Sequence, residues 1–306
     1  MELRGAPVAV TGATGFLGRY IVDVLLARGA RVIGVVRNPD RVPDLVRRGV
    51  ELRRADLADR ERLAAGFAGA RALVSNAALL SLGNRSWDEH ERTNVQGTRN
   101  VFEAAAEAGV ERVVHVSSVA VYHGHRSPRV AEDHPQYTPD SRPTITNAYA
   151  RSKALSEQLA WRLAQEHGLE LTTVRPCAIY GAFDDNFTAI FKWLARWPVT
   201  VMPAFSRLAV VYAGDVAEAI ALALEKPVAI GRAYNVTGDD VTVWAFARAW
   251  REAGGRLTPL TLPLVVPFTR WFDHERATRE LGWRNRPLVD GLRDTFAREA
   301  LDGGAA

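Results

Sequence analysis

A tyrosine and a lysine four positions apart, Tyr149 and Lys153, are the pair in this sequence best suited to acid–base chemistry. Residues 149–167 carry apolar side chains at helical spacing, so the pair is expected to share one helix face. A phenol with an ordinary pKa of about 10 is a poor base at neutral pH, and a neighbouring ammonium group favours the phenolate. Ser118 follows a predicted strand and is placed to hydrogen-bond a substrate oxygen. The three residues together predict proton transfer to or from an oxygen atom.

A glycine-rich turn near the start of the chain predicts a nucleotide site. The turn lies between an apolar run at 7–10, typical of a buried strand, and a segment at 19–28 with helical periodicity. In the spacing G-x-x-G-x-x-G, Gly12 permits a tight turn, Gly15 lets the backbone approach a pyrophosphate, and Gly18 lets the helix pack closely. Free N–H groups at the helix N-terminus favour phosphate. Without this context, an ordinary glycine turn would be the simpler interpretation.

The end of the second predicted strand, 31–36, bears on which nicotinamide cofactor is bound. Sites that prefer NAD usually place an acidic residue there to hold the ribose 2′-hydroxyl. Val36 stands at about that position and Arg37 follows it. A guanidinium group can pair with a 2′-phosphate, so the sequence predicts NADP, with NAD as the alternative. The alternative interpretation of Arg37 is a surface residue that begins a turn.

The order of the elements predicts the fold. Strands are expected at 7–10, 31–36, 50–54, 72–75, 112–117 and 169–175, with helices between them. This alternation predicts an α/β fold, a doubly wound parallel (Rossmann) sheet with a smaller mixed C-terminal substrate lobe. The Rossmann domain is expected to comprise 1–176 plus about 214–236, and the lobe 177–213 plus 237–306. A substrate pocket is expected between them.

Composition narrows the class of protein. The chain has 306 residues, of which 47% are hydrophobic and 24% charged, as in ordinary soluble globular proteins. Its net charge of +4 is small and scattered, which predicts no nucleic-acid partner.

Cys177 is the single cysteine, so no intrachain disulfide can form. The sequence shows no signal peptide and no apolar run of transmembrane length, so we expect a cytoplasmic protein without a membrane span. His123 and His125 lack a third ligand at metal spacing, so no metal is expected.

Further motifs resemble the extended short-chain dehydrogenases/reductases, the NAD(P)-dependent epimerase/dehydratase family. They lie, in this order, at 11–18, 76–78, 94–98, 116–122, 149–153, 175–176, 212–217 and 281–283. Segments 178–181 and 234–244 resemble the 3β-hydroxysteroid dehydrogenase-like branch. The resemblance covers nearly the whole chain. It implies an NAD(P)-dependent oxidoreductase, and a homodimer formed through helices at 87–108 and 149–167.

The resemblance also implies roles for matching positions. Tyr149 would be the general acid/base, Lys153 would lower its pKa and hold the nicotinamide ribose, and Ser118 would orient the carbonyl or hydroxyl group. Asn94 would support a water molecule or the Lys153 side of the site. The expected cofactor-binding residues are Gly12, Thr14, Gly15, Phe16, Leu17, Arg37, Asp56, Leu57, Asn76, Ala77, Ala78, Asn94, Tyr149, Lys153, Pro176 and Ile179.

The function that these observations predict is NADP-dependent interconversion of a ketone and a secondary alcohol on a small hydrophobic molecule. Leu79, Leu80 and the aromatic segment 183–197 suit such a ligand. One alternative is an NAD-dependent nucleotide-sugar epimerase, which Arg37 disfavours. Another is a non-catalytic NADP-sensing regulator on the same fold, which the presence of Tyr149 disfavours. Dehydration is disfavoured because Val119 stands where dehydratases have an acid.

Overall fold

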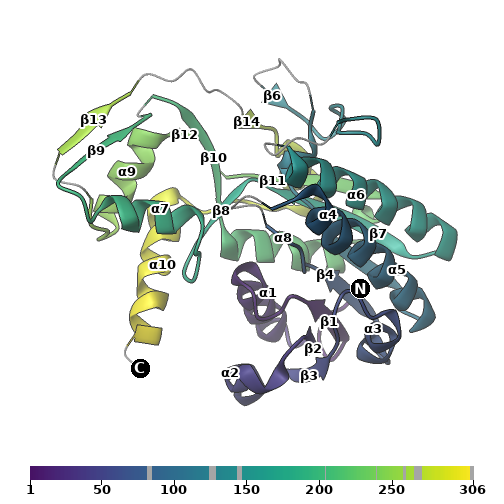
Figure 1. Cartoon of the computed structure of the whole chain (residues 1–306). Coiled ribbons are helices and arrows are strands. Elements are labelled where there is room, and N and C mark those ends of the chain that lie inside the picture. The colour runs from purple at the N-terminus through teal and green to yellow at the C-terminus, as the bar shows by residue number, and fades with distance from the viewer. Residues whose placement is uncertain are drawn as a thin grey trace.

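A parallel sheet forms the centre of the molecule (Figure 1). The computed structural model describes residues 1–80, 85–123, 129–142, 147–203, 205–238, 240–257, 260–264 and 271–303. In these residues, seven strands lie in the order β11-β7-β5-β4-β1-β2-β3, and every neighbouring pair is parallel. Their bounds are β1 (Pro7–Thr11), β2 (Arg31–Val36), β3 (Glu51–Arg54), β4 (Ala72–Ser75), β5 (Arg112–Val116), β7 (Glu170–Pro176) and β11 (Arg232–Val236). The predicted Rossmann sheet is confirmed. The strand order reverses between β1 and β4, and such a point is where these sheets bind ligands.

Helices cover both faces of this sheet. One face carries α1 (Phe16–Ala27) and α8 (Ala213–Glu225), and the other carries α3 (Arg60–Phe67), α5 (Gly97–Glu107) and α6 (Ala148–His167). Successive side chains of a strand point to opposite faces, so Val8 and Val10 pack into one apolar cluster and Ala9 into the other. The short helix α2 (Pro43–Arg47) precedes β3. Three short turns of 3₁₀-helix lie at η1 (Pro39–Arg41), η3 (Val119–Val121) and η4 (Pro227–Ala229).

The helix expected at 87–108 is interrupted. It consists of α4 (Trp87–His90), a π-helical segment η2 (Glu91–Gln96) and then α5. Ser86 and Glu89 form a capping box at its start. A π-helical turn inserts an extra residue into the helical repeat and often marks a functional site.

The C-terminal part of the chain adds small sheets beside the main one. A mixed sheet contains β8 (Ala178–Tyr180), β10 (Arg207–Tyr212) and β12 (Asp240–Thr242). The pairs β9 (Val199–Met202) with β13 (Leu260–Pro263), and β6 (Arg129–Val130) with β14 (Trp271–Phe272), are each parallel. Four helical elements complete this part, namely α7 (Phe187–Leu194), α9 (Val243–Glu252), the π-helical η5 (Ala277–Leu281) and α10 (Leu288–Gly303). The expected smaller mixed lobe is present, while the assignment of exact domain boundaries stays a prediction.

An aromatic core holds the lobe together. The Phe246 ring centroid lies 4.7 Å from that of Phe191 on α7 and 5.8 Å from that of Tyr180 on β8. Trp250 stacks on Phe191 with centroids 5.7 Å apart and meets Phe296 of α10 edge to face. These contacts fix α7 and α9 against β8 and α10. Among the described residues, no helix combines the length and apolar character needed to cross a bilayer.

Candidate active site

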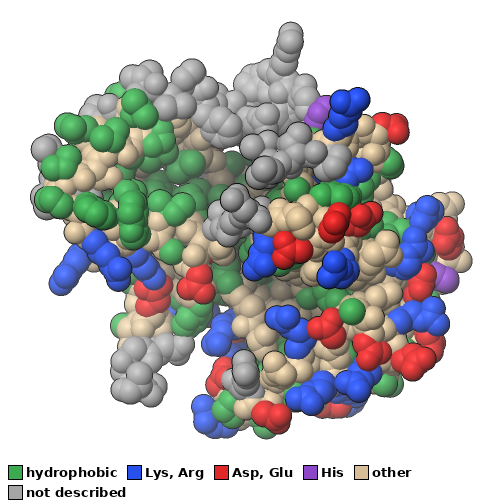
Figure 2. Space-filling view, viewed as in Figure 1, with side chains coloured by type: hydrophobic (Ala, Val, Ile, Leu, Met, Phe, Trp, Pro, Cys, Tyr) green, Lys and Arg blue, Asp and Glu red, His purple; other side chains and the backbone are tan. Residues whose placement is uncertain are grey.

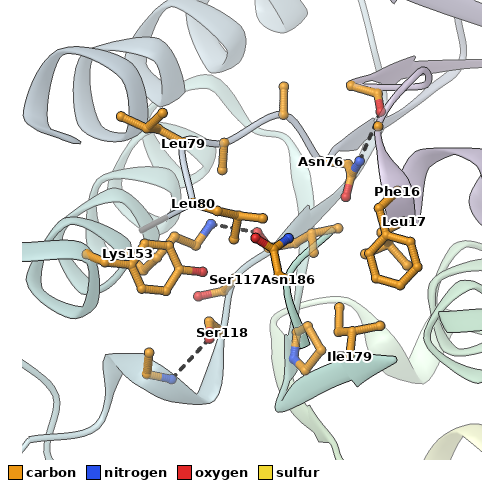
Figure 3. A pocket seen from close by; sticks show the side chains of 18 of the residues that line it. Phe16, Leu17, Asn76, Leu79, Leu80, Ser117, Ser118, Lys153, Ile179 and Asn186 are labelled. Carbon is orange, nitrogen blue, oxygen red and sulfur yellow. Dashed lines mark hydrogen bonds between the residues drawn. The ribbon is translucent and has the colours of Figure 1, made fainter. Parts of the chain in front are cut away.

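A cavity of about 1010 Å³ opens at the carboxyl ends of the central strands. Its volume reaches the upper end of the range of roughly 300–1,000 Å³ that small-molecule sites occupy. One end is lined by the glycine turn after β1, and the other extends to Phe187 and Leu208 of the smaller lobe. The main sheet and the lobe therefore both contribute walls to one site (Figure 3).

The glycine turn has the shape that a phosphate group requires. Gly12 has a φ of 67°, which L side chains rarely adopt. A Cβ on Gly18 would lie 2.0 Å from the Gly12 carbonyl oxygen, so α1 can approach the turn only with glycine there. Gly15 lines the cavity and is the N-cap of α1, without a side-chain capping bond. The first turn of α1 is thus open toward the cavity, and the residues present fit a dinucleotide pyrophosphate.

The end of β4 is tied to this turn through Thr11. The Thr11 hydroxyl accepts hydrogen bonds from the backbone N–H groups of Asn76 and Ala77, at 3.0 and 3.2 Å. The Asn76 side chain donates to the Gly12 carbonyl oxygen at 3.4 Å. These bonds hold 76–78 as one wall of the cavity, as the motif predicted. Thr11 itself was not expected to have a role.

Arg37 lies at the end of β2, where the predicted cofactor selectivity would act. Its side chain is exposed and lines the cavity. No acidic side chain in the described part of the chain forms an ion pair with it. Asp56, on the neighbouring strand end, instead accepts a hydrogen bond from the Ala58 N–H at 2.9 Å. The Arg37 guanidinium is therefore available for an anionic group.

The three residues expected to do chemistry lie together. Tyr149 and Lys153 project from α6, and Ser118 follows β5. Ser118 is hydrogen-bonded to the Tyr149 phenol, and its hydroxyl also accepts from the Ala120 N–H at 3.1 Å. Lys153 Nζ donates to the Val116 carbonyl oxygen at 2.8 Å. Figure 3 shows Lys153 and Ser118 on the same side of the cavity.

Burial dominates the electrostatics of this group. It raises the pKa of Tyr149, against the opposing effect of the Ser118 hydrogen bond. It lowers the pKa of Lys153 to about 8, while the nearby Glu157 carboxylate acts in the opposite direction. The net shift of the Tyr149 pKa is therefore upward, so burial outweighs the lowering that was expected from Lys153. At neutral pH the arrangement presents a protonated phenol beside a mostly charged lysine, which suits donation of a proton.

Asn94 is the one expected site residue that does not line the cavity. It lies in the π-helical segment and is almost fully buried. Its side-chain amide donates to Leu79 O at 3.1 Å and to Ser152 Oγ at 2.9 Å, and its oxygen accepts from Leu79 N at 2.7 Å. All of these bonds are internal, so Asn94 joins the loop after β4 to α6. It positions the walls of the site and has no direct contact with the cavity.

A buried ion pair below the site was not foreseen. Glu157 lies one helical turn after Lys153 and is fully buried, and its carboxylate accepts two bonds from Arg175 Nε, at 3.0 and 3.1 Å. Arg175 Nη1 donates to the Tyr122 hydroxyl at 2.7 Å, which in turn donates to Asn235 Oδ1 at 2.6 Å. The network connects α6 to β7 and β11. In the sequence, the signal for this ion pair was the acidic Glu157 on an otherwise apolar face of the helix predicted at 149–167.

The remaining expected residues all line the cavity, but several further wall residues were missed. Six of the missed residues come from the long loop and from the lobe, where the sequence has little periodicity. They are Tyr137, Asn186, Arg207, Leu208, Ala209 and Phe272. Asp184 also borders the cavity, but its carboxylate caps α7 by accepting from the Thr188 N–H at 2.7 Å.

His123, one of the two histidines considered as ligands, contacts an aromatic ring. His123 meets the ring of Tyr137, with centroids 4.5 Å apart, and His125 lies outside the described residues. Within the described ranges, no three His, Cys, Asp or Glu side chains are grouped closely enough to hold a metal ion.

Comparison with known proteins identifies the family. Residues 8–237 match the model of the NAD dependent epimerase/dehydratase family. The chain belongs to this family. The protein is thus an NAD(P)-dependent oxidoreductase of the extended short-chain dehydrogenase/reductase type, as the motifs predicted.

Relatives of this oxidoreductase include both reductases and epimerases. The chain is 35% identical to cinnamoyl-CoA reductase 1 of Petunia hybrida, over 96% of this chain and 92% of that protein. It is 37% identical to a 4-hydroxy-2-methyl-3-oxo-4-farnesyl-3,4-dihydroquinoline-1-oxide ketoreductase of Stigmatella aurantiaca, over 60% of this chain and 56% of that protein. A structure of UDP-glucose-4-epimerase from Stenotrophomonas maltophila, with bound NAD and formylated UDP-arabinopyranose, superposes with a TM-score of 0.83 at 25% identity. That match covers 98% of this chain and all of the other.

Proposed function

We propose that this oxidoreductase uses NADP to interconvert a ketone and a secondary alcohol on a small hydrophobic molecule. The observation that carries the proposal is the grouping of Ser118, Tyr149 and Lys153 where the cofactor groove meets an apolar part of the cavity. A carbonyl oxygen placed between the two hydroxyl groups would be close to both a hydrogen-bond donor and a proton donor.

The cofactor is held by the glycine turn and selected by Arg37. Backbone N–H groups at the start of α1 bind the pyrophosphate, and the exposed Arg37 guanidinium pairs with the 2′-phosphate. Ala77, Ala78, Pro176 and Ile179 line the groove along which the rest of the dinucleotide lies. A nicotinamide held there would supply the hydride for the carbonyl carbon.

The chain's own residues handle the proton. Ser118 orients the carbonyl by hydrogen bonding to its oxygen. As negative charge develops on that oxygen, the Tyr149 hydroxyl donates its proton and becomes a phenolate. The Lys153 ammonium stabilises this phenolate electrostatically. The reverse sequence, with Tyr149 as the base, oxidises the alcohol.

The substrate end of the cavity favours an apolar molecule. Its walls include Leu79, Leu80, Tyr137, Phe187, Leu208 and Phe272. Burying apolar ligand surface there contributes roughly 25 cal/mol per Å². The ketoreductase of Stigmatella aurantiaca, whose printed substrate carries a farnesyl chain, supports a hydrophobic ketone.

The second candidate is a nucleotide-sugar epimerase, favoured by the similarity to the NAD-bound epimerase structure. Two observations weigh against it. Val36 stands at about the position where an NAD site usually has an acid, and Arg37 follows it. Arg207, the arginine at the lobe end of the cavity, donates to the Asp240 carboxylate at 2.5 Å, which reduces the positive charge available to a diphosphate.

The first experiment identifies the nucleotide. The purified protein is denatured and any released nucleotide is analysed, and then NADPH and NADH are titrated separately by fluorescence. We expect an empty protein with tighter NADPH binding, followed by NADPH oxidation in the presence of hydrophobic ketones. Aryl thioesters and UDP-sugars complete the substrate panel.

Two results would contradict the proposal. Stoichiometric trapped NAD with turnover of a UDP-sugar would establish the epimerase. Tight NADPH binding without oxidation by any carbonyl compound would favour the non-catalytic sensor.

A further inference from the structure

One face of α6 carries three ionisable side chains in succession. Tyr149, Lys153 and Glu157 are four residues apart, so each lies one helical turn from the next on the same side of the helix. Tyr149 and Lys153 line the cavity, whereas Glu157 is fully buried and does not. Along the helix, Glu157 therefore lies on the far side of Lys153 from the Tyr149 phenol.

Arg175 of β7 holds the Glu157 carboxylate in its ionised form. The two side chains are 4% and 0% exposed and form a buried ion pair. Trp161 Nε1, on the same helix, also donates to Glu157 Oε1 at 3.3 Å. Burial by itself raises the pKa of Glu157, but the charge and the hydrogen bonds of Arg175 outweigh burial, and the pKa is lowered. A negative charge is thus fixed one helical turn from Lys153.

The ammonium group of Lys153 has no anion bonded directly to it in the described part of the chain. Its hydrogen bond goes to the neutral Val116 carbonyl group. Burial lowers the pKa of Lys153 to about 8, and the charge of Glu157 is the effect that opposes this lowering. Without that charge, the lysine would lose its proton closer to neutral pH.

The other titratable groups that pack around these side chains are uncharged near pH 7 or are paired elsewhere. The pKa of His115 on β5 is lowered to about 3 by burial and by the charge of Lys153. Burial also lowers the pKa of His90 on α4 and raises the pKa of Tyr122, which follows η3. The two carboxylates of α5 form ion pairs with Arg60 of α3.

Charged pairs on the surface differ from the buried pair of Glu157 and Arg175. Figure 2 shows acidic and basic side chains interspersed over the helices that cover the main sheet. Arg162 and Glu166, also on α6, are one such pair, 3.5 Å apart with side chains 58% and 52% exposed. Water and salt screen exposed charges, so they act weakly on groups inside the protein. The Glu157 charge is buried and therefore acts on Lys153 with little screening.

We propose that Glu157, kept ionised by Arg175, is a positioning residue that holds Lys153 in its charged form while Tyr149 gives up its proton. This inference rests on the proposed acid–base role of Tyr149. The charges then alternate in sign, from the Arg175 guanidinium through the Glu157 carboxylate and the Lys153 ammonium group to the phenolate that forms on Tyr149. A carboxylate bonded directly to Lys153 would compete with the phenolate for the ammonium group. At one turn away, Glu157 keeps the lysine charged without occupying it.

The first test measures the ionisation of Lys153 without any substrate. The chain has three lysines, Lys153, Lys192 and Lys226, so ¹³C-lysine labelling of the full chain gives few enough signals for an NMR titration. The signal that is missing from Lys153→Met assigns Lys153, which should titrate near pH 8 in wild type. In Glu157→Gln the midpoint should move to lower pH by about one unit or more, because a nearby opposite charge changes a pKa by about 1–3. Glu157→Asp keeps the charge and should restore most of the wild-type midpoint.

Two further variants separate charge from structure. Glu166→Gln makes the same substitution at an exposed position of the same helix and should leave the Lys153 midpoint unchanged. Glu157→Gln leaves a buried arginine without its partner, so Glu157→Gln/Arg175→Met is measured beside it. Replacing both members of a buried ion pair by neutral side chains is often tolerated, and the double variant should show the same movement of the midpoint.

The second test is the pH dependence of ketone reduction. The wild-type rate should fall above about pH 8, as Lys153 loses its proton. With its midpoint about one unit lower, Glu157→Gln should be about fivefold slower than wild type at pH 8 and should approach the wild-type rate at pH 6, where the lysine is charged in both proteins. A variant with only structural damage would be slow at every pH.

Three results would overturn the inference. The Lys153 midpoint could be the same in wild type and in both variants that lack the Glu157 charge, or it could move equally in Glu166→Gln. A kinetic loss that is the same at every pH would leave Glu157 with a structural role only. Failure to reduce any carbonyl compound would instead overturn the proposed function, while the NMR titration would still decide whether Glu157 sets the charge of Lys153.

Discussion

At the scale of single residues, the site combines a phenol whose pKa is raised with a lysine whose pKa is lowered. Both shifts have the same cause, because burial disfavours the charged form of each group. The result at neutral pH is a protonated Tyr149 next to a Lys153 that keeps most of its charge. This pairing is prepared for reduction, in which the phenol gives up its proton.

The Tyr149→Phe variant should lose turnover and keep cofactor affinity. Removing the hydroxyl removes the proton donor, and general acid catalysis contributes typically about 10²–10⁴-fold. The aromatic ring remains, so the walls of the groove are preserved. Steady-state kinetics with NADPH and a reactive ketone, together with a fluorescence titration, measure the two effects. Undiminished turnover would show that another group donates the proton.

The Arg37→Asp variant should shift cofactor preference from NADP toward NAD. A charge-assisted hydrogen bond contributes about 1.5–3 kcal/mol, so we expect the affinity ratio to change at least about tenfold. Arg47→Asp, on the exposed surface of α2, is the control for the change in net charge. The ratio of NADPH to NADH dissociation constants is the measurement. If both variants leave this ratio unchanged, Arg37 does not contact the 2′-phosphate.

Lys153 should make stability depend on pH above neutrality. Its pKa is about 8 in the folded protein and about 10.4 in an unfolded chain, so between these values the unfolded state binds more protons. The contribution of Lys153 to stability therefore rises as pH increases through that window, by up to about 3 kcal/mol. Urea unfolding of wild type and Lys153→Met at pH 7 and pH 10 measures it. We expect the stability of wild type to increase relative to the variant, and a constant difference would contradict the lowered pKa.

At the scale of elements, two glycines of the same turn have different roles, one in helix packing and one in binding. Gly18 answers a packing demand, since a Cβ there would also lie 2.9 Å from Ala13 Cα. Gly15 answers a binding demand, since a Cβ there would meet the Gly12 oxygen at 3.3 Å and otherwise occupy the space left for the phosphates. The π-helical segment also shapes the site. It directs the Asn94 amide to Leu79 and Ser152, which holds the loop after β4 against α6.

The variants Gly15→Ala and Gly18→Ala should therefore differ in kind. Gly18→Ala should lower the free energy of unfolding by several kcal/mol, because its Cβ overlaps backbone atoms that have little freedom to move. Gly15→Ala should change stability by about 1 kcal/mol or less and weaken NADPH binding about tenfold or more, since its backbone φ of −75° accepts alanine. Thermal unfolding and nucleotide titration distinguish the two. The opposite pattern would mean that the roles of these glycines are exchanged.

At the scale of the whole molecule, one cavity is shared by the sheet and the smaller lobe. The lobe is attached through contacts such as the buried bond from Trp283 Nε1 to Asp215 O, at 2.8 Å, and the partly buried bond from Arg286 Nε to Asp215 Oδ1, at 2.7 Å. A ligand that fills the groove binds the folded chain and has little affinity for the unfolded one. Binding should therefore stabilise the molecule as a unit.

NADPH should raise the melting temperature more than NADH at equal concentration. At one hundred times its dissociation constant, a ligand adds about 2.7 kcal/mol to the free energy of unfolding. Thermal unfolding with each nucleotide measures the difference, and Arg37→Asp should reduce or reverse it. Equal shifts for the two nucleotides in wild type would remove the basis for NADP preference.

Sequence patterns alone were sufficient to predict the parallel sheet, the glycine turn and the pairing of Tyr149 with Lys153. Each depends on local patterns, namely short apolar runs, glycine spacing and a four-residue repeat on one helix. Of the seventeen predicted catalytic and cofactor-binding residues, all but Asn94 line one cavity, because strands of a parallel sheet end at one edge.

The surroundings of those residues, in contrast, could not be predicted from local patterns. Asn94 became a positioning residue because a π-helical turn directs its amide to the Leu79 backbone and to the Ser152 hydroxyl. The Glu157–Arg175 ion pair and the wall formed by Leu208 and Phe272 depend on contacts between distant segments, which leave no periodic signal. The same reason applies to Tyr149, whose pKa is set by burial and by a hydrogen bond from another element, and neither is encoded in the spacing of its own helix.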